Sequence, residues 1–270
     1  MSAWALGLAA LSPALGVAQV TGSSSASITN LQFQVNDLKP DDGQAAGFNL
    51  VHTGLQTQAS VARPPVEGDG RARWSMEWLD PLSLDAGLQG VWAASDVTRH
   101  SLEVAGSASG DWANYYARAA GLIGGLGDFD AGTQIAPHTE LTISFDWNVH
   151  ASVSGPCSST STTSCQWAEA LAFVDWYGDW QPPQQWQVGG RVDFTLPNPQ
   201  PLDQDGTFSL IFTNNSDGWM GRNVIFDLVA RGGVLPAALV PEPGRFELLA
   251  LGLLALAGCH RCARRARTAA

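Results

Sequence analysis

The chain has 270 residues, of which 45% are apolar and only 14% are charged, so it has enough apolar material for one sizeable core and is not a disordered protein. Its net charge of −11 hides an asymmetry, because residues 19–243 hold 9 basic and 24 acidic residues, a balance of −15. Phosphates are bound by Lys and Arg, so this acidic body argues against nucleic acid or an anionic membrane surface as a partner.

The N-terminal segment predicts an export signal. Residues 3–18 read AWALGLAALSPALGVA, without a charge, and Gly16 and Ala18 give the small-x-small pattern of a cleavage site. No Lys or Arg precedes the apolar run, which departs from the usual signal and leaves a buried element as the alternative. Pro13 would interrupt a core helix, however. We therefore expect residues 1–18 to be a signal peptide and residues after it to be exported.

Apolar and polar residues alternate along the body with the period of two that predicts β-strands. In "TELTISFDWNVHASV", Leu141, Ile143 and Phe145 fall on one face, whereas Asp146 falls on the other. Similar patterns predict strands at 26–38, 75–80, 88–95, 100–108, 139–153, 168–180, 190–196, 206–214 and 222–232. In the first of these, Ile28 lies near the start, and Leu31, Phe33 and Val35 share a face.

Turn signals rich in Gly, Pro, Asn and Asp separate these segments. They lie at 39–43, 67–70, 181–185, 197–206 and 214–218. The one helix candidate is "GDWANYYARAAGLIGG", residues 110–125, where Tyr116 and Ala120 can share a face. Nine or ten short strands joined by such turns predict an all-β fold, an antiparallel β-sandwich of jelly-roll-like type over residues 19–235.

Two cysteines in the body suggest a disulfide. Cys157 and Cys165 bracket "SSTSTTS", between the strand that ends near Val153 and the one that starts near Trp167. In an exported protein an oxidised pair is the natural reading, and it would contribute about 2–3 kcal/mol by closing a short loop. Free thiols or part of a metal site are the alternatives, but no Cys-x-x-Cys or His pair lies nearby.

Aromatic residues provide the clearest functional lead in the body. Trp167, Trp176, Tyr177, Trp180 and Trp186 crowd 20 residues, and prolines and glycines flank the last of them. Exposed indole rings stack on sugar faces, whereas the same rings inside a sandwich are core. We take Trp176, Trp180 and Trp186 as candidate carbohydrate contacts, with core or loop packing as the alternative.

Catalysis has weaker support. Paired carboxylates can hydrolyse glycosides, and the candidates are Asp146, Glu169, Asp175 and Asp179. Asp146 and Asp175 each precede a Trp, and we expect them on neighbouring strands. Aspartates on the solvent face of a half-buried strand are common, however, and no spacing indicates catalysis. We therefore expect a protein that is not an enzyme, with no catalytic residue assigned.

A metal or cofactor is not indicated either. "LDQDG", residues 202–206, and "NNSDG", residues 214–218, could supply oxygen ligands to calcium, but turn formation explains both. The histidines are scattered and show no ligand spacing. No nucleotide-binding fingerprint is present, so we expect neither a cofactor nor a bound metal.

The C-terminal segment combines a short apolar run with a basic end. Residues 246–259 would span about 21 Å as a helix, against roughly 30 Å of hydrocarbon, and Pro241 and Pro243 prevent extension of the helix toward the N-terminus. An arginine cluster follows and orients this end toward the cytoplasm by the positive-inside rule. Its members are Arg261, Arg264, Arg265 and Arg267. A single-pass tail anchor is one reading, and a cleaved sorting signal is the other.

"VPEPGRFELLALGLLALAGCHRCARRAR", residues 240–267, resembles the PEP-CTERM sorting signal of Gram-negative bacteria that produce exopolysaccharide. The resemblance covers about 30 residues and rests on the triplet Pro241-Glu242-Pro243, the leucine-rich run and the arginines. Glu247 within the run departs mildly from the pattern. The resemblance implies that an exosortase recognises the triplet, cleaves near it and delivers the protein to the surface.

These features predict three parts: the signal peptide at 1–18, the β-sandwich at 19–235, and a linker with the sorting signal at 236–270. The C-terminal helix would sit transiently in the inner membrane. The expected function is a structural or adhesive surface or matrix protein within exopolysaccharide or biofilm. A carbohydrate-binding module is the first alternative, with exopolysaccharide as candidate partner, and a secreted glycan-degrading enzyme is the second.

Overall fold

A computed structural model describes residues 21–51, 53–63, 67–77, 80–110, 112–123, 133–155, 166–178, 183–194 and 199–234. The described part of the chain contains fourteen strands and no helix. The strands are β1 (Thr21–Asp37), β2 (Phe48–Leu50), β3 (Thr53–Arg63), β4 (Glu67–Ser75), β5 (Leu82–Leu88), β6 (Val91–Val97), β7 (Leu102–Ser109), β8 (Ala113–Ile123), β9 (Thr133–Ile135), β10 (Thr139–Ser154), β11 (Gln166–Gly178), β12 (Gln184–Asp193), β13 (Leu202–Asn214) and β14 (Met220–Val234).

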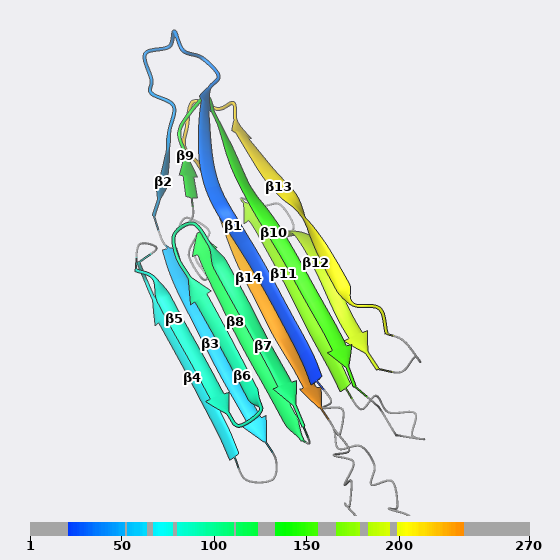
Figure 1. Ribbon diagram of the computed structural model, residues 1–270. Coiled ribbons are helices and arrows are strands. Elements are labelled where there is room, and N and C mark those ends of the chain that lie inside the picture. Colours follow the sequence, from blue (N-terminus) through cyan, green and yellow to red (C-terminus); the bar gives the residue numbers. More distant parts are fainter. Residues whose placement is uncertain are drawn as a thin grey trace, which may run out of the picture.

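The strands form two antiparallel sheets that stack face to face, which confirms the predicted β-sandwich (Figure 1). The first sheet, sheet A, has the order β13-β10-β1-β7-β6-β5. The second, sheet B, has the order β12-β11-β14-β8-β3-β4; in addition, β9 pairs with the start of β14, and β2 pairs with β9. Each strand of sheet A packs over one of sheet B: β13 over β12, β10 over β11, β1 over β14, β7 over β8, β6 over β3 and β5 over β4. This is the aligned type of sheet packing.

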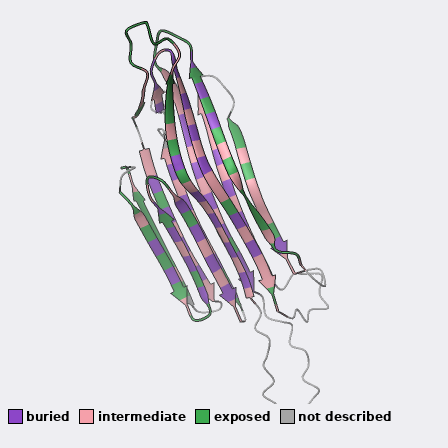
Figure 2. Ribbon diagram, turned by 45° about the horizontal axis from the view of Figure 1, so that its top comes forward, coloured by how far each residue is buried: buried purple, intermediate pink, exposed green. Residues whose placement is uncertain are grey.

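The core lies between the sheets and follows the alternation seen in the sequence (Figure 2). On β10, Leu141, Ile143, Phe145 and Val149 are buried, and Trp147 packs against the core. Several inward positions of β8 and β11 carry alanine, so apolar burial there comes from many small side chains. Removing this inward surface from water is the main stabilising contribution to folding.

A bulge in β1 corrects the phase of its apolar residues. Ile28 and Leu31 are both buried although three positions separate them, because the register shifts between Thr29 and Gln32 and Asn30 takes a left-handed φ of 54°. Beyond the bulge, the ring of Phe33 stacks on that of Phe48 with centroids 5.4 Å apart. The shared face predicted for the first strand therefore holds for Leu31 and Phe33, whereas Val35 is 37% exposed.

The predicted helix at 110–125 is wrong, because residues 113–123 form β8. The inward positions of β8 are Ala113, Tyr115, Ala117 and Ala119, and its outward positions include Tyr116 and Ala120. Alanine is a good helix former, but β8 pairs along its length with β14 on one side and β3 on the other. Tertiary pairing here overrides local propensity.

The predicted turns and strand boundaries are only partly correct. Turns at 39–43 and after Asn214 are confirmed. Residues 67–70 lie inside β4, and residues 202–206 lie inside β13, so "EGDG" and "LDQDG" are strand rather than turn. Residues 88–95 are not one strand: Gln89 and Gly90 turn the chain between β5 and β6, with Gly90 at a φ of 78°. The strands are also more numerous and longer than expected, β1 having 17 residues.

The two ends of the described chain leave the same end of the sandwich. Gly22 and Gly233, next to the first and last described residues, lie close to each other. β1 runs from there to the far end, and β14 runs back beside it in the opposite sheet. The β13–β14 turn and the segment between β1 and β2 lie at the far end (Figure 1). We call these the terminal end and the distal end of the sandwich.

Candidate functional site

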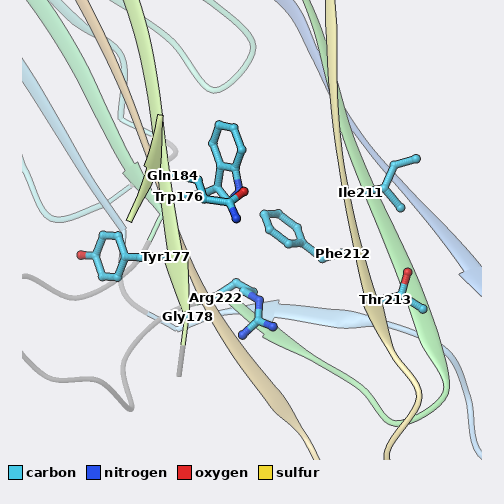
Figure 3. Close-up of a pocket in the computed structure, with 8 residues that line it drawn as sticks. All are labelled: Trp176, Tyr177, Gly178, Gln184, Ile211, Phe212, Thr213 and Arg222. Carbon is cyan, nitrogen blue, oxygen red and sulfur yellow. The ribbon is translucent and has the colours of Figure 1, made fainter. Parts of the chain in front are cut away.

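A pocket of about 190 Å³ opens between the sheets in the distal half. Its walls come from the last residues of β11, the start of β12, the end of β13 and the start of β14. The lining residues are Trp176, Tyr177, Gly178, Gln184, Ile211, Phe212, Thr213 and Arg222. Figure 3 shows that Trp176, Phe212 and Arg222 point toward one another, whereas Tyr177 and Ile211 point away.

Two contacts hold the indole of Trp176 in place. Its Nε1–H donates to Oε1 of Gln184 across the β11–β12 pair at 3.0 Å. Its ring also lies 6.2 Å from that of Phe208 in the opposite sheet, at an interplanar angle of 48°. The indole therefore has a fixed orientation, in which it packs against the core and also lines the pocket.

Arg222 brings a positive charge to the inner side of the sandwich. It has the same inward parity as Val224 and Phe226 on β14, and its Nη1 donates to the backbone oxygen of Gly221 at 2.9 Å. Its cross-strand partner on β11 is Gly178. A methyl group at Gly178 would overlap the guanidinium, so the glycine leaves the space that the arginine head occupies.

The three tryptophans proposed as sugar contacts have different positions. Trp176 lines the pocket. Trp186 lies instead in an aromatic cluster between the sheets, with ring centroids 4.6 Å from Phe208, 5.8 Å from Phe145 and 5.6 Å from Trp147. Its role is core packing, the alternative reading. Trp180 lies outside the described residues.

The prediction that Asp146 and Asp175 lie on neighbouring strands is wrong. β10 and β11 belong to different sheets, and both aspartates point outward, on opposite faces of the sandwich. Asp146 accepts a hydrogen bond from Nδ2 of Asn30 at 2.6 Å. Packed sheets are about 10 Å apart, and catalytic carboxylate pairs are no more than about 9.5 Å apart, so these two cannot act on one glycosidic bond. The Glu169 carboxylate accepts a hydrogen bond from Nε of Arg231. Asp179 is outside the described residues.

A second hollow of about 260 Å³ lies on the outer face of sheet A. Its floor consists of small residues of β1, β6 and β7, including Ser25 and Ser27, and Asp96 and Glu103 stand opposite each other at its side. This hollow carries no aromatic ring and no cation. It is a shallow acidic depression in a polar sheet face, and we do not take it as the site.

Several residues singled out in the sequence lie outside the described part of the chain. These include the sorting triplet Pro241, Glu242 and Pro243, the arginines after residue 260, and both Cys157 and Cys165. Across the described ranges, no three His, Cys, Asp or Glu side chains gather as metal ligands. The same ranges contain no helix long and apolar enough to cross a membrane.

Sequence reasoning missed Arg222, Phe212 and Gln184. A signal for Arg222 was present, because an arginine in phase with the buried Val224 and Phe226 must point between the sheets. The other two required knowledge of which strands face each other. No family model matches the chain, and neither the search of curated proteins nor that of solved structures finds a similar protein.

Proposed function

We propose that this protein is an exported surface or matrix protein, sorted by an exosortase, with a structural or adhesive role in exopolysaccharide. In this proposal residues 1–18 direct export and residues 236–270 carry the sorting signal. Pro241, Glu242 and Pro243 are the recognition triplet. The support for sorting is the resemblance of residues 240–267 to PEP-CTERM signals.

The geometry that best supports an adhesive role is the position of the chain ends relative to the pocket. Val234 precedes the tail at the terminal end, and Arg222 lines the pocket on the same strand. At ~3.3 Å per residue, β14 separates the two by about 40 Å. A protein attached or delivered through its C-terminus would therefore hold the pocket away from the attachment point.

Further parts of the proposal concern segments outside the described residues. Residues 246–259 would form the single hydrophobic helix that sits transiently in the inner membrane, with the arginine cluster on the cytoplasmic side. Cys157 and Cys165 would form a disulfide next to the terminal end of β10 and β11. The sandwich itself would be of the jelly-roll type.

Mass spectrometry of the exported protein tests the sorting proposal. We expect no peptide beyond Gly244 in the surface or matrix fraction, and accumulation of the uncleaved chain in the inner membrane for Glu242→Gln. Glu247→Gln removes the same charge from the apolar run and serves as the matched control, with normal cleavage expected. Intact peptides from residues 250–270 in the surface fraction would contradict the proposal.

Carbohydrate binding is the second candidate function, and the observation that favours it is the fixed indole of Trp176, which lines the distal pocket. A glycan array with wild type and Trp176→Ala tests it. Trp167→Ala is the control, because Trp167 lies on the outer face of β11, under the guanidinium of Arg191 at 4.4 Å. This role would be rejected if wild type bound no glycan, or if Trp176→Ala bound glycan as well as Trp167→Ala does.

A further inference from the structure

The distal pocket contains a cation that lacks an acidic partner among the described residues. Arg118, Arg191 and Arg231 each pair with a carboxylate on the outer face of sheet B. Arg222 instead points between the sheets, and its described hydrogen bond goes to its neighbour's carbonyl. A guanidinium has five N–H donors, and the described hydrogen bond uses only one of them, so the others have no described acceptor. Arg222 is half-buried on the wall of the pocket, so a ligand in the pocket can reach these donors.

The backbone of β11 is shaped around this guanidinium. Gly178 stands opposite Arg222, and any side chain there would overlap the arginine head. The head therefore lies against a strand backbone that cannot ionise. This leaves the donor edge of the guanidinium available for a planar, doubly accepting anion, and carboxylates fit that geometry.

The indole and the guanidinium are spaced for one sugar ring. Trp176 and Gly178 are two residues apart on the inward side of β11, which is about 6.6 Å along the strand, and Arg222 lies beside Gly178. A pyranose stacked on the indole would therefore direct a carboxylate on its edge toward Arg222. The pocket volume of about 190 Å³ is below the ~300–1,000 Å³ of drug-sized sites, which suits a single unit.

The acidic surface of the rest of the molecule restricts the binding of an anionic polymer to the neighbourhood of Arg222. Between residues 19 and 243 the net charge is −15, so an acidic polymer is repelled from most of the surface. Attraction to an anion at Arg222 must then be local and specific, not a general effect of a basic protein. An acidic chain would engage the pocket with one unit and stay clear of the acidic hollow on sheet A.

We propose that the distal pocket binds a uronic acid unit of an acidic polysaccharide, with the sugar face on Trp176 and the carboxylate on Arg222. This inference rests on the second proposed function, carbohydrate binding. The Gln184 amide that holds the indole also lines the pocket and is placed to contact a ring hydroxyl.

Oligogalacturonate and its fully methyl-esterified form test the proposal, because they share the ring and differ in the charge of the carboxyl group. Intrinsic tryptophan fluorescence and calorimetry on the purified full chain would measure both affinities. We expect the free acid to bind at least about tenfold more tightly than the ester, since charge-assisted hydrogen bonds are roughly twice as strong as neutral ones. Arg222→Gln should abolish this preference, and Trp176→Ala should abolish both interactions.

One control and one further variant test whether loss of the preference for the free acid is specific to the Arg222 guanidinium. Arg99→Gln removes the same charge from an exposed turn and should leave the preference unchanged. Gly178→Ala leaves Arg222 in the chain but displaces its head, so it should also lose the preference while the far-UV spectrum stays native. Equal binding of acid and ester would overturn the uronate proposal and leave carbohydrate binding intact. Binding of neither would overturn both, and an unchanged preference in Arg222→Gln would also overturn the uronate assignment.

Discussion

The hydroxyl groups of Tyr115 on β8 and Ser24 on β1 form a 2.8 Å hydrogen bond in the interior of the sandwich. Both residues are only 3% exposed, and they belong to opposite sheets. The Tyr115 ring lies against Gly106 of sheet A and Gly232 of sheet B, where any larger residue would overlap it. A polar bridge thus joins the two sheets through the core, and two glycines make the space for it.

Tyr115→Phe should destabilise the protein by about 1 kcal/mol, because it removes this bond while keeping the ring. The cost stays moderate because the Ser24 hydroxyl retains the backbone oxygen of Arg231 at 3.4 Å. Urea denaturation measures the change. The control is Tyr116→Phe, the same chemical change on the outer side of β8, where a smaller effect is expected; equal effects would mean that the bridge contributes nothing specific.

Alkaline pH should weaken the fold through the same residue. Burial raises the pKa of the Tyr115 phenol well above its ordinary value, and the bond to Ser24 offsets this only in part. Above pH ~10 the unfolded chain loses the Tyr115 proton while the folded chain keeps it. The free energy of unfolding is therefore unaffected by this group below pH ~10 and decreases above it, by up to about 1.4 kcal/mol per pH unit. Denaturation curves between pH 9 and 11 should show this slope, and Tyr115→Phe should reduce it.

The Tyr116 phenol provides a comparison for the alkaline experiment. Partial burial also raises the pKa of Tyr116, and the Arg118 charge opposes that effect. Tyr116→Phe should therefore reduce the alkaline slope less than Tyr115→Phe does. A slope that stays the same in Tyr115→Phe would show that the loss of stability comes from other groups.

Gly106→Ala should cost about 1–3 kcal/mol, because the added methyl would overlap the Tyr115 ring within a packed interior. Gly190→Ala is the matched control on β12, since no atom lies within 4 Å of the methyl that it adds. Thermal melts of both variants measure the difference. In a Tyr115→Leu background the penalty at Gly106 should shrink, and a penalty that persists there would place the clash elsewhere.

Much of the fold was predictable because one face of each sheet is buried and the other is exposed to solvent, which leaves an alternating pattern in the sequence. The alternation in residues 139–153 and 206–214 predicted the buried faces of β10 and β13 correctly, including the 61% exposed Ile211 on the other side. β8 was mistaken for a helix because Ala and Gly at its inward positions leave no apolar alternation to detect. Its strand identity comes from its neighbours β14 and β3, which sequence alone does not reveal.

The site was only partly predictable, for a related reason. Aromatic density found Trp176, which lines the pocket, but the same density also pointed to Trp186, which does not. Both indoles are partly buried and pack against the core. The two can be told apart only once the opposing strand is known, because the ring of Phe208 stacks on Trp186 at 4.6 Å and only tilts against Trp176 at 6.2 Å. We likewise expected Asp146 and Asp175 on neighbouring strands, but the chain crosses from one sheet to the other between β10 and β11, which places the two aspartates on opposite faces.

A buried amide holds the distal end together next to the pocket. Asn214, 2% exposed, shares the two N–H hydrogens of Nδ2 among the backbone oxygens of Ile135, Ala136 and Gly218, which lie 3.0, 2.9 and 2.8 Å from that nitrogen. Its Oδ1 accepts from the backbone N–H and the hydroxyl of Ser216 at 3.1 and 2.7 Å. One side chain therefore fixes the β13–β14 turn and ties it to the end of β9.

Asn214→Ala should cost roughly 3 kcal/mol, because buried carbonyl groups lose their donor and the turn loses its internal bonds. The neighbouring Asn215→Ala removes the same group from an exposed position and should change stability by less than about 0.5 kcal/mol. Urea denaturation compares them, and hydrogen exchange should show that the amides of β9 and of residues 215–219 lose protection before those of β10. Uniform loss across both sheets would mean that Asn214 stabilises the whole sandwich rather than its distal end.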